Sequence, residues 1–161
     1  LSRGLGDVYK RQLNQLVAED LDFEQVVQVI TKYQAKTKLL FVLAKVDNLV
    51  KNGRLSKLIG AVVGLLNIRM VGQASDTGTL ELLQKARGQK KAIKATFDEM
   101  IKAGYAGGHI TIAHRNNEKF IEQFSELVRE KFAQASIEVL PTSGLCSFYA
   151  EEGGLLMGYE I

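Results

Sequence analysis

Cysteine and histidine are scarce in this sequence, which holds one cysteine and two histidines in 161 residues. The single Cys146 excludes an internal disulfide and is typical of a reducing compartment, so the sequence predicts a cytoplasmic protein. Uninterrupted apolar runs of about 18 residues are also missing, which predicts no membrane-spanning helix. The net charge is only +3 and lysine and glutamate are interspersed, so no general affinity for nucleic acid is predicted.

The usual signatures of catalysis and nucleotide binding are missing as well. The sequence has no GxGxxG, GxxxxGK(S/T) or GxSxG motif. His109 and His114, five apart in a predicted strand, point to opposite faces and cannot form one metal site by themselves; they are expected to be polar residues at strand ends. Cys146 has no CxxC partner and no histidine near it in sequence, which favours an inert thiol. The sequence therefore predicts no catalytic residue, no metal and no cofactor.

Apolar residues alternate between short continuous runs and stretches with helical spacing from residue 13 onward. Helices are expected at 22–33, 46–51, 89–102 and 117–132, and strands at 38–45, 68–73, 79–85, 109–114 and 137–140. With 46% hydrophobic residues, the chain is long enough for one domain with a real core. The alternation predicts an α/β fold, a mixed sheet with helices packed on it.

The first twelve residues, LSRGLGDVYKRQ, show no regular apolar period and no signal-peptide pattern. We interpret residues 1–12 as a non-native or disordered leader and 13–161 as the domain. The hypothesis predicts that residues 1–12 pack on nothing, and buried side chains at Leu5 or Val8 would contradict it.

The longest ordered pattern runs from Asn52 to Val71, NGRLSKLIGAVVGLLNIRMV. Gly53 can adopt a positive φ, and Arg54 follows it at the entrance to a predicted helix. The apolar face of that helix consists of Leu55, Leu58, Ile59, Val62, Val63 and Leu66. An arginine held at a tight turn suits recognition of a carboxylate or phosphate, and the alternative is a structural arginine bound to backbone carbonyls of the turn.

A second charged pattern follows at residues 85–94. Five cations occur within ten residues: Lys85, Arg87, Lys90, Lys91 and Lys94. They could meet phosphate or an acidic partner surface, and the alternative is a solvated start of a helix. Aromatic residues lie in helix faces and not between these charges, which favours a protein partner over single-stranded nucleic acid.

Four stretches together resemble the DegV family: LAKVDNLVKNGRLSK, GLLNIRMV, KARGQKKAIKA and HITIAHRNNEKFIEQF. The family pattern runs Leu-x-x-Leu, Gly-Gly-Arg, an apolar helix, Leu-Asn-Ile-Lys-Pro and a Lys/Arg-rich segment. The matching positions are Leu49, Gly53, Arg54, Leu66, Asn67, Ile68, Lys85, Arg87, Lys90 and Lys91. The resemblance covers about residues 13–161, and these residues resemble the carboxy-terminal half of the bacterial DegV proteins.

The resemblance implies a fatty-acid carrier. Members have two α/β domains with one long-chain fatty acid in a tunnel between them, and this chain would lack the amino-terminal domain. The carrier presents the carboxylate to a separate fatty acid kinase subunit for phospholipid synthesis and performs no bond chemistry itself. An arginine and a histidine of the carboxy-terminal domain belong to the head-group network. An exposed half of the tunnel would also favour self-association of this chain.

The resemblance assigns site residues one by one. Arg54 takes the arginine role, and Leu58, Ile59 and Val62 would line the tunnel, although core packing is the commoner fate of such a stripe. The family's Lys-Pro is Arg69-Met70 here, and its closing His-x-Gly-Pro-Gly motif is replaced. No histidine is present there, and Ser147 or Phe148 falls near its place. The basic residues at 85–94 would face the partner.

Three other functions remain compatible with the residues. A regulatory protein-interaction module would use the basic 85–94 patch without lipid and show salt-sensitive binding. Half of an enzyme would take its catalytic residues from a missing partner domain. Nucleic-acid binding without sequence preference ranks third among them.

Overall fold

The computed structural model describes residues 2–19, 21–55, 67–75 and 77–161, with the backbone alone for residues 2–8. In chain order the elements are α1 (Ser2–Val17), α2 (Phe23–Ala35), β1 (Thr37–Leu43), α3 (Asp47–Lys51), β2 (Ile68–Ala74), β3 (Leu80–Arg87), α5 (Gln89–Lys102), β4 (Ile110–His114), α6 (Glu118–Lys131), β5 (Ile137–Pro141), α7 (Gly144–Ala150) and β6 (Leu155–Glu160). The predicted mixed α/β fold is confirmed. No helix in the described part of the chain is long and apolar enough to cross a membrane.

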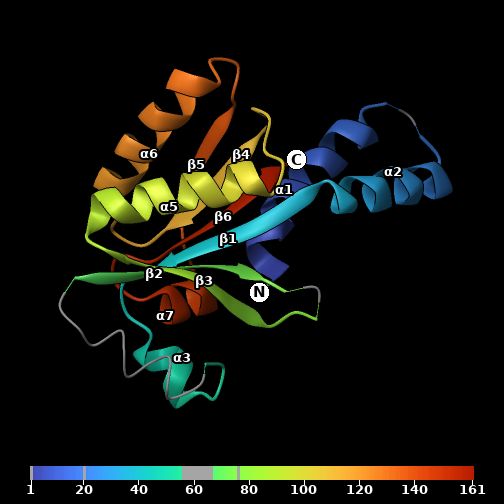
Figure 1. Ribbon diagram of the computed structural model, residues 1–161. Helices are drawn as coiled ribbons and strands as arrows, with labels where there is room; N and C mark the ends of the chain where they lie inside the picture. Colours follow the sequence, from blue (N-terminus) through green and yellow to red (C-terminus); the bar gives the residue numbers. More distant parts are fainter. Residues whose placement is uncertain (1, 20, 56–66, 76) are drawn as a thin grey trace.

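The strands form one six-stranded sheet in the order β3-β2-β1-β6-β4-β5 (Figure 1). All neighbouring pairs are antiparallel except β4 and β5, which are parallel and are connected through α6. The central β1 is buried at six of its seven residues, which explains why its sequence, TKLLFVL, is a nearly continuous apolar run.

Side chains of alternate residues divide the core between the two faces of the sheet. On one face Leu40 and Val42 of β1 join the inward sides of α5 and α6. On the other face Phe41 and Leu43 join Met70 and the α3 residue Leu49. This second face is covered by α1 near β4 and β6, whereas α3 and α7 lie together farther along it.

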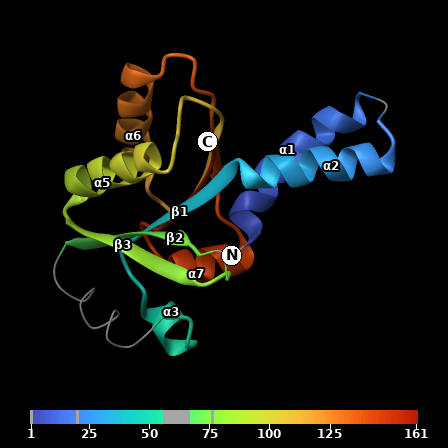
Figure 2. The same cartoon turned by 45° about the vertical axis from the view of Figure 1, so that its right-hand side comes forward.

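Helices α1 and α2 form a hairpin that projects from the sheet (Figure 2). Asp22 and Gln25 make a capping box at the start of α2, since Asp22 Oδ1 accepts from the Gln25 amide at 2.8 Å and Gln25 Oε1 accepts from the Asp22 amide at 3.0 Å. No residue of α2 is buried, and Phe23 at its start is 81% exposed. The apolar residues of α2 at helical spacing, Val26, Val29, Ile30 and Tyr33, are therefore only partly buried.

The prediction that residues 1–12 pack on nothing is wrong at Tyr9. Helix α1 begins at Ser2, and the Tyr9 hydroxyl lies 3.2 Å from Thr37 Oγ1. Its ring also meets Tyr33 edge-on, with centroids 6.2 Å apart. The interactions come from a hairpin partner and a strand distant in sequence, so the local pattern contained no sign of them.

Two further expectations need adjustment. Asn117 occupies the N-cap position of α6, but its side chain does not cap the helix; Nδ2 donates to the Gly153 carbonyl at 2.7 Å. Pro141 was expected to follow the last strand residue, whereas it is the last residue of β5. It fits there because β5 is an edge strand, where a missing amide hydrogen leaves no partner unpaired. The predicted helix over residues 55–66 lies outside the described residues from Ser56 onward.

His109 is a buried polar residue just before β4, with 5% of its surface exposed. Its Nδ1 lies 3.1 Å from Ser136 Oγ and its Nε2 lies 3.0 Å from Thr111 Oγ1. Burial, with a smaller effect of the Arg11 charge, lowers the pKa of this imidazole despite the carboxylates of Glu160 and Glu138. His109 is therefore held neutral, and no cluster of three or more potential metal-ligating side chains occurs in the described part of the chain.

Lowering the pH is expected to destabilise the protein through His109. Its pKa is lower in the folded than in the unfolded chain, so the unfolded chain takes up a proton first as the pH falls below about 6.5. The free energy of unfolding should then fall by at most about 1.4 kcal/mol per pH unit until the folded-state pKa is passed. Urea unfolding at a series of pH values measures this. The step should vanish in His109→Gln and persist in His114→Gln; an unchanged step in His109→Gln would contradict the assignment.

Candidate functional site

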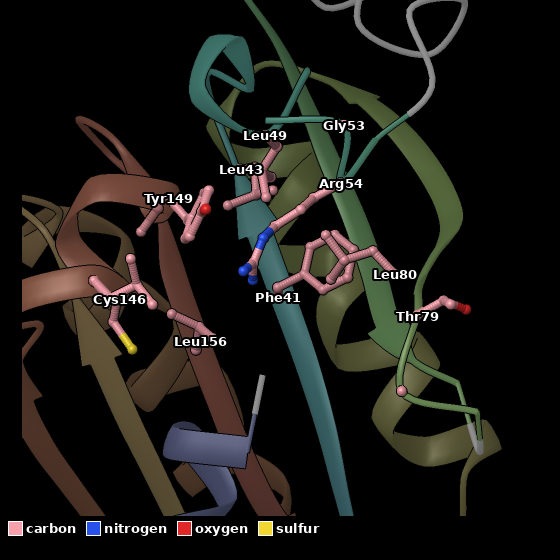
Figure 3. A pocket seen from close by; sticks show the side chains of 13 residues that line it. Phe41, Leu43, Leu49, Gly53, Arg54, Thr79, Leu80, Cys146, Tyr149 and Leu156 are labelled. Carbon is pink, nitrogen blue, oxygen red and sulfur yellow. The ribbon is translucent and has the colours of Figure 1, made fainter. Parts of the chain in front are cut away.

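A cavity of about 500 Å³ opens on the sheet face that carries α3 and α7 (Figure 3). Its lining comes from the sheet, from the α3 turn, from the β2–β3 hairpin and from α7. The lining residues are Phe41, Leu43, Leu49, Gly53, Arg54, Gly78, Thr79, Leu80, Leu145, Cys146, Tyr149, Ala150 and Leu156. The volume is typical of a small-molecule site, and the lining is predominantly apolar.

Arg54 is the one charged side chain among these described lining residues. The turn that places it depends on Gly53, which has φ +66°, and on the bond from the Arg54 amide to the Leu49 carbonyl at 2.9 Å. The guanidinium extends into the cavity, with its carbon 4.5 Å from the centroid of the Tyr149 ring. This cation–π contact leaves the N–H groups of the guanidinium available to an anionic ligand.

Helix α7 is held by polar contacts at Ser147 and Phe148, the two residues before Tyr149. The Ser147 hydroxyl donates to Thr142 Oγ1 at 2.8 Å, and Arg115 Nη1 donates to the Ser147 carbonyl at 2.8 Å. Asn48 Nδ2 donates to the Phe148 carbonyl at 2.8 Å, which ties α7 to the start of α3. The two helices that bear Tyr149 and precede Arg54 are therefore held together.

Glu151 completes this link between α7 and α3. It has φ +54°, an uncommon conformation for a residue with a side chain. Its carboxylate accepts from the Asn48 backbone amide at 2.9 Å, at the beginning of α3, where negative charge is favourable. The bond offsets part of the backbone strain.

The predicted lipid-contacting residues fall into three groups. Arg54 lines the cavity. Ser147 and Phe148 do not: Ser147 is engaged with Thr142, and Phe148 is 44% exposed beside Tyr149. Leu58, Ile59 and Val62 lie outside the described residues.

Sequence reasoning missed the wall that α7 contributes. Leu145, Cys146, Tyr149 and Ala150 share one side of α7 and line the cavity. Their spacing of one, three and one is a helical signal, but a seven-residue helix that follows a proline is easily interpreted as a tail. Tyr149, and not its neighbours, is the α7 side chain that meets Arg54.

The basic cluster is on the surface, at the end of β3 and the start of α5. Its members Lys85, Arg87, Lys90, Lys91 and Lys94 are all exposed. Lys94 Nζ pairs with the Asp98 carboxylate at 2.8 Å, whereas no ion pair in the described part of the chain engages the other four. None of the five lines the cavity.

Comparison with known proteins places this chain among close relatives. A family model described as "Uncharacterised protein, DegV family" matches residues 7–159. A DegV domain-containing protein of Streptococcus gordonii is 72% identical over 155 residues, which are 96% of this chain and 55% of that protein. The chain thus spans about half the length of the curated relatives it matches.

Solved structures with the same fold contain fatty acids. The Streptococcus pneumoniae Fatty Acid Kinase (Fak) B3 protein loaded with linoleic acid is 73% identical, with a TM-score of 0.94 over 96% of this chain and 55% of that one. A DegV family protein from Eubacterium eligens loaded with heptadecanoic acid is 34% identical, with a TM-score of 0.92 over 96% of this chain and 56% of that one. The family model covers residues 7–159, most of the sequence, so this chain belongs to the DegV family.

Proposed function

We propose that this chain forms one half of a fatty-acid carrier, with Arg54 at the carboxylate end of the bound lipid. The observation that carries the proposal is a single guanidinium among described lining residues that are otherwise uncharged and mostly apolar. A fatty acid is complementary to this arrangement, because it has one anionic group at the end of a long apolar chain. The fatty acids bound to the Streptococcus and Eubacterium relatives support this class of ligand.

Arg54 and Tyr149 would together hold the head group. The guanidinium offers paired N–H donors that suit a carboxylate, and the Tyr149 hydroxyl lies on the same side of the cavity as Arg54 (Figure 3). Tyr149 would thereby supply a donor in the head-group network, where the family pattern has a histidine. Phe41, Leu43 and Leu156 would contact the acyl chain, with affinity of about 0.8 kcal/mol per buried methylene.

The remaining wall would come from the part of the relatives that this chain does not span. The cavity opens outward, and its rim exposes Leu145 at 51% and the neighbouring Phe148 at 44%. Two exposed apolar side chains at the mouth of an apolar cavity fit a covering domain. Without that domain, the same rim would favour self-association of the chain.

We assign the chain a carrier role rather than catalysis, with phosphorylation of the carboxylate left to a separate kinase in a pathway to phospholipid. The name of the Streptococcus pneumoniae relative, a Fatty Acid Kinase B3 protein, supports such a partner. Lys85, Arg87, Lys90 and Lys91 would meet an acidic surface of the kinase, since their charges are exposed and unpaired within the described chain. Lys94 would contribute less because Asp98 already engages it. A lipid-free interaction module would use this same surface.

Cys146 provides an internal test of lipid binding. It is a free thiol in the cavity wall and the one cysteine of this sequence. In the full-length protein, a saturating long-chain fatty acid should slow alkylation of Cys146 by about tenfold or more, because the acyl chain covers the sulfur. Mass spectrometry of the peptide that contains Cys146 follows the modification.

The matched control is the corresponding long-chain alkane, which has the same apolar chain and no carboxylate. It should protect less because Arg54 gains no partner. Equal alkylation rates with and without fatty acid would contradict the carrier proposal and favour the interaction module.

A further inference from the structure

Arg69 lies at the beginning of β2, on the opposite face of the sheet from the cavity. Alternation along β2 sets its direction: Met70 belongs to the core beside the cavity, and Val71 belongs to the core beneath α5 and α6. Arg69 therefore shares the face of Val71, opposite Ala86 of β3 in the strand register. An arginine on this otherwise apolar face requires an explanation.

The guanidinium of Arg69 is incompletely satisfied. Its Nε and Nη1 atoms are buried, and neither has a hydrogen-bond partner among the described residues. Burial also lowers the pKa of the side chain, so its charge is poorly compensated by its surroundings. Buried polar groups in folded proteins are nearly always paired, and an orphaned one indicates a missing partner. The side chain remains partly exposed, which leaves a path for that partner from solvent.

The acidic side chains next to Gly153 in sequence are engaged elsewhere. Gly153 flanks the guanidinium, since a Cβ on this glycine would lie 3.6 Å from Nη1 of Arg69. The two residues before Gly153 are glutamates. Glu151 binds the Asn48 amide at 2.9 Å, and Glu152 accepts from Asn116 Nδ2 at 3.2 Å and lies 3.9 Å from Arg115 Nε. Neither carboxylate is therefore paired with Arg69.

The surface beside Arg69 adds positive charge. The Gly88 amide donates to the Asn67 carbonyl at 2.8 Å, which brings the start of α5 to the start of β2. Gly88 is the N-cap of this 14-residue helix, and no side chain caps it. Lys90 and Lys91, in the first turn of this helix, are exposed. Free amides of the first helical turn and neighbouring cations both favour an anion.

We propose that Arg69, with the first turn of α5, binds a phosphate group. The start of β2, which carries Arg69, lies beside the start of α5, and a phosphate dianion compensates an unpaired cation and free helix amides better than a monovalent carboxylate. Its oxygens also match the fork of N–H donors of an arginine. The proposed phosphate site is built on Arg69 and lies on the opposite face of the sheet from the cavity. It therefore does not depend on the carrier function.

The proposal is tested with inorganic phosphate on this chain, with sodium chloride as the reference at matched ionic strength. Phosphate should raise the melting temperature of the wild-type chain along a saturating curve, beyond any effect of chloride. Arg69→Met should bind phosphate at least tenfold more weakly, whereas Arg129→Met, which removes an exposed arginine of α6, should bind it as the wild type does.

In phosphate-free buffer, the wild type should lose the advantage in melting temperature over Arg69→Met that saturating phosphate gives it. Arg69→Met removes a buried charge that has no partner, so it should melt no lower than the wild type in phosphate-free buffer. Arg69→Lys keeps the positive charge but lacks the paired N–H donors of the guanidinium, so it should bind phosphate with intermediate affinity. The same phosphate dependence in wild type and Arg69→Met, or an equal effect of chloride, would overturn the proposal, as would stabilisation by acetate but not by phosphate.

Discussion

Under the proposed carrier function, replacing Arg54 with alanine is expected to remove most of the bound fatty acid from the full-length protein. The guanidinium is the one charged group among the described lining residues, so its loss leaves a buried carboxylate without a compensating charge. Hydrogen bonds to charged groups contribute about 1.5–3 kcal/mol, which corresponds to roughly 10- to 100-fold weaker retention. Mass spectrometry of an organic extract of the purified protein, referred to the protein concentration, measures the change.

Two variants make this experiment specific. Arg54→Lys keeps the positive charge and should retain part of the lipid, because the ammonium lacks the paired donors of the guanidinium. Arg129→Ala removes an exposed arginine on the other side of the sheet and should retain all of it. Full lipid occupancy in Arg54→Ala would show that the carboxylate binds elsewhere, and the role of Tyr149 would then need revision as well.

Replacing Gly72 with alanine is expected to destabilise the protein strongly. Gly72 lies at an irregularity of the β2–β3 pairing and faces Phe41 of β1. A Cβ there would collide with the Glu81 carbonyl oxygen and with the Phe41 ring, whose Cε2 would lie at 2.7 Å. Overpacking of a core costs about 1–3 kcal/mol and occasionally more, and we expect the upper part of this range because one obstacle is backbone.

The clash should also reach the cavity, because Phe41 lines it. A loss of about 3 kcal/mol lowers the melting temperature of a chain of this size by roughly 6–12 °C. Gly78→Ala is the matched control: Gly78 has φ +79° and nothing within 4 Å of an added Cβ, so the cost should be only about 1–2 kcal/mol of backbone strain. Equal melting temperatures for the two variants would contradict the packing argument.

Local patterns were sufficient for most of the elements. The apolar run at β1 and the helical spacing of α5 and α6 predicted a mixed α/β sheet. The Asp22–Gln25 capping box was predictable because a cap is formed by residues three apart. Gly53 before Arg54 likewise indicated a turn with positive φ, and it has φ +66°.

Contacts between segments that are distant in sequence could not be predicted from local patterns. Tyr9 meets Thr37 and Tyr33 only after α1 and α2 fold against each other and the sheet. Tyr149 reaches Arg54, 95 positions earlier in the numbering, because α7 is bonded to α3 through Asn48. Resemblance to a family indicated the region of the family histidine, whereas the structure shows that Tyr149 lines the cavity and that Ser147 and Phe148 do not.

The sequence alone determined most of the strands and helices, the turn before Arg54 and the resemblance to the DegV proteins, because each depends on spacing within short segments. Tertiary structure decided which side chains share a cavity and which charge lacks a partner. The six-stranded order β3-β2-β1-β6-β4-β5 brings α3, the β2–β3 hairpin and α7 to one face and leaves Arg69 on the other. That division arises from strand pairing across the whole chain, and no local pattern encodes it.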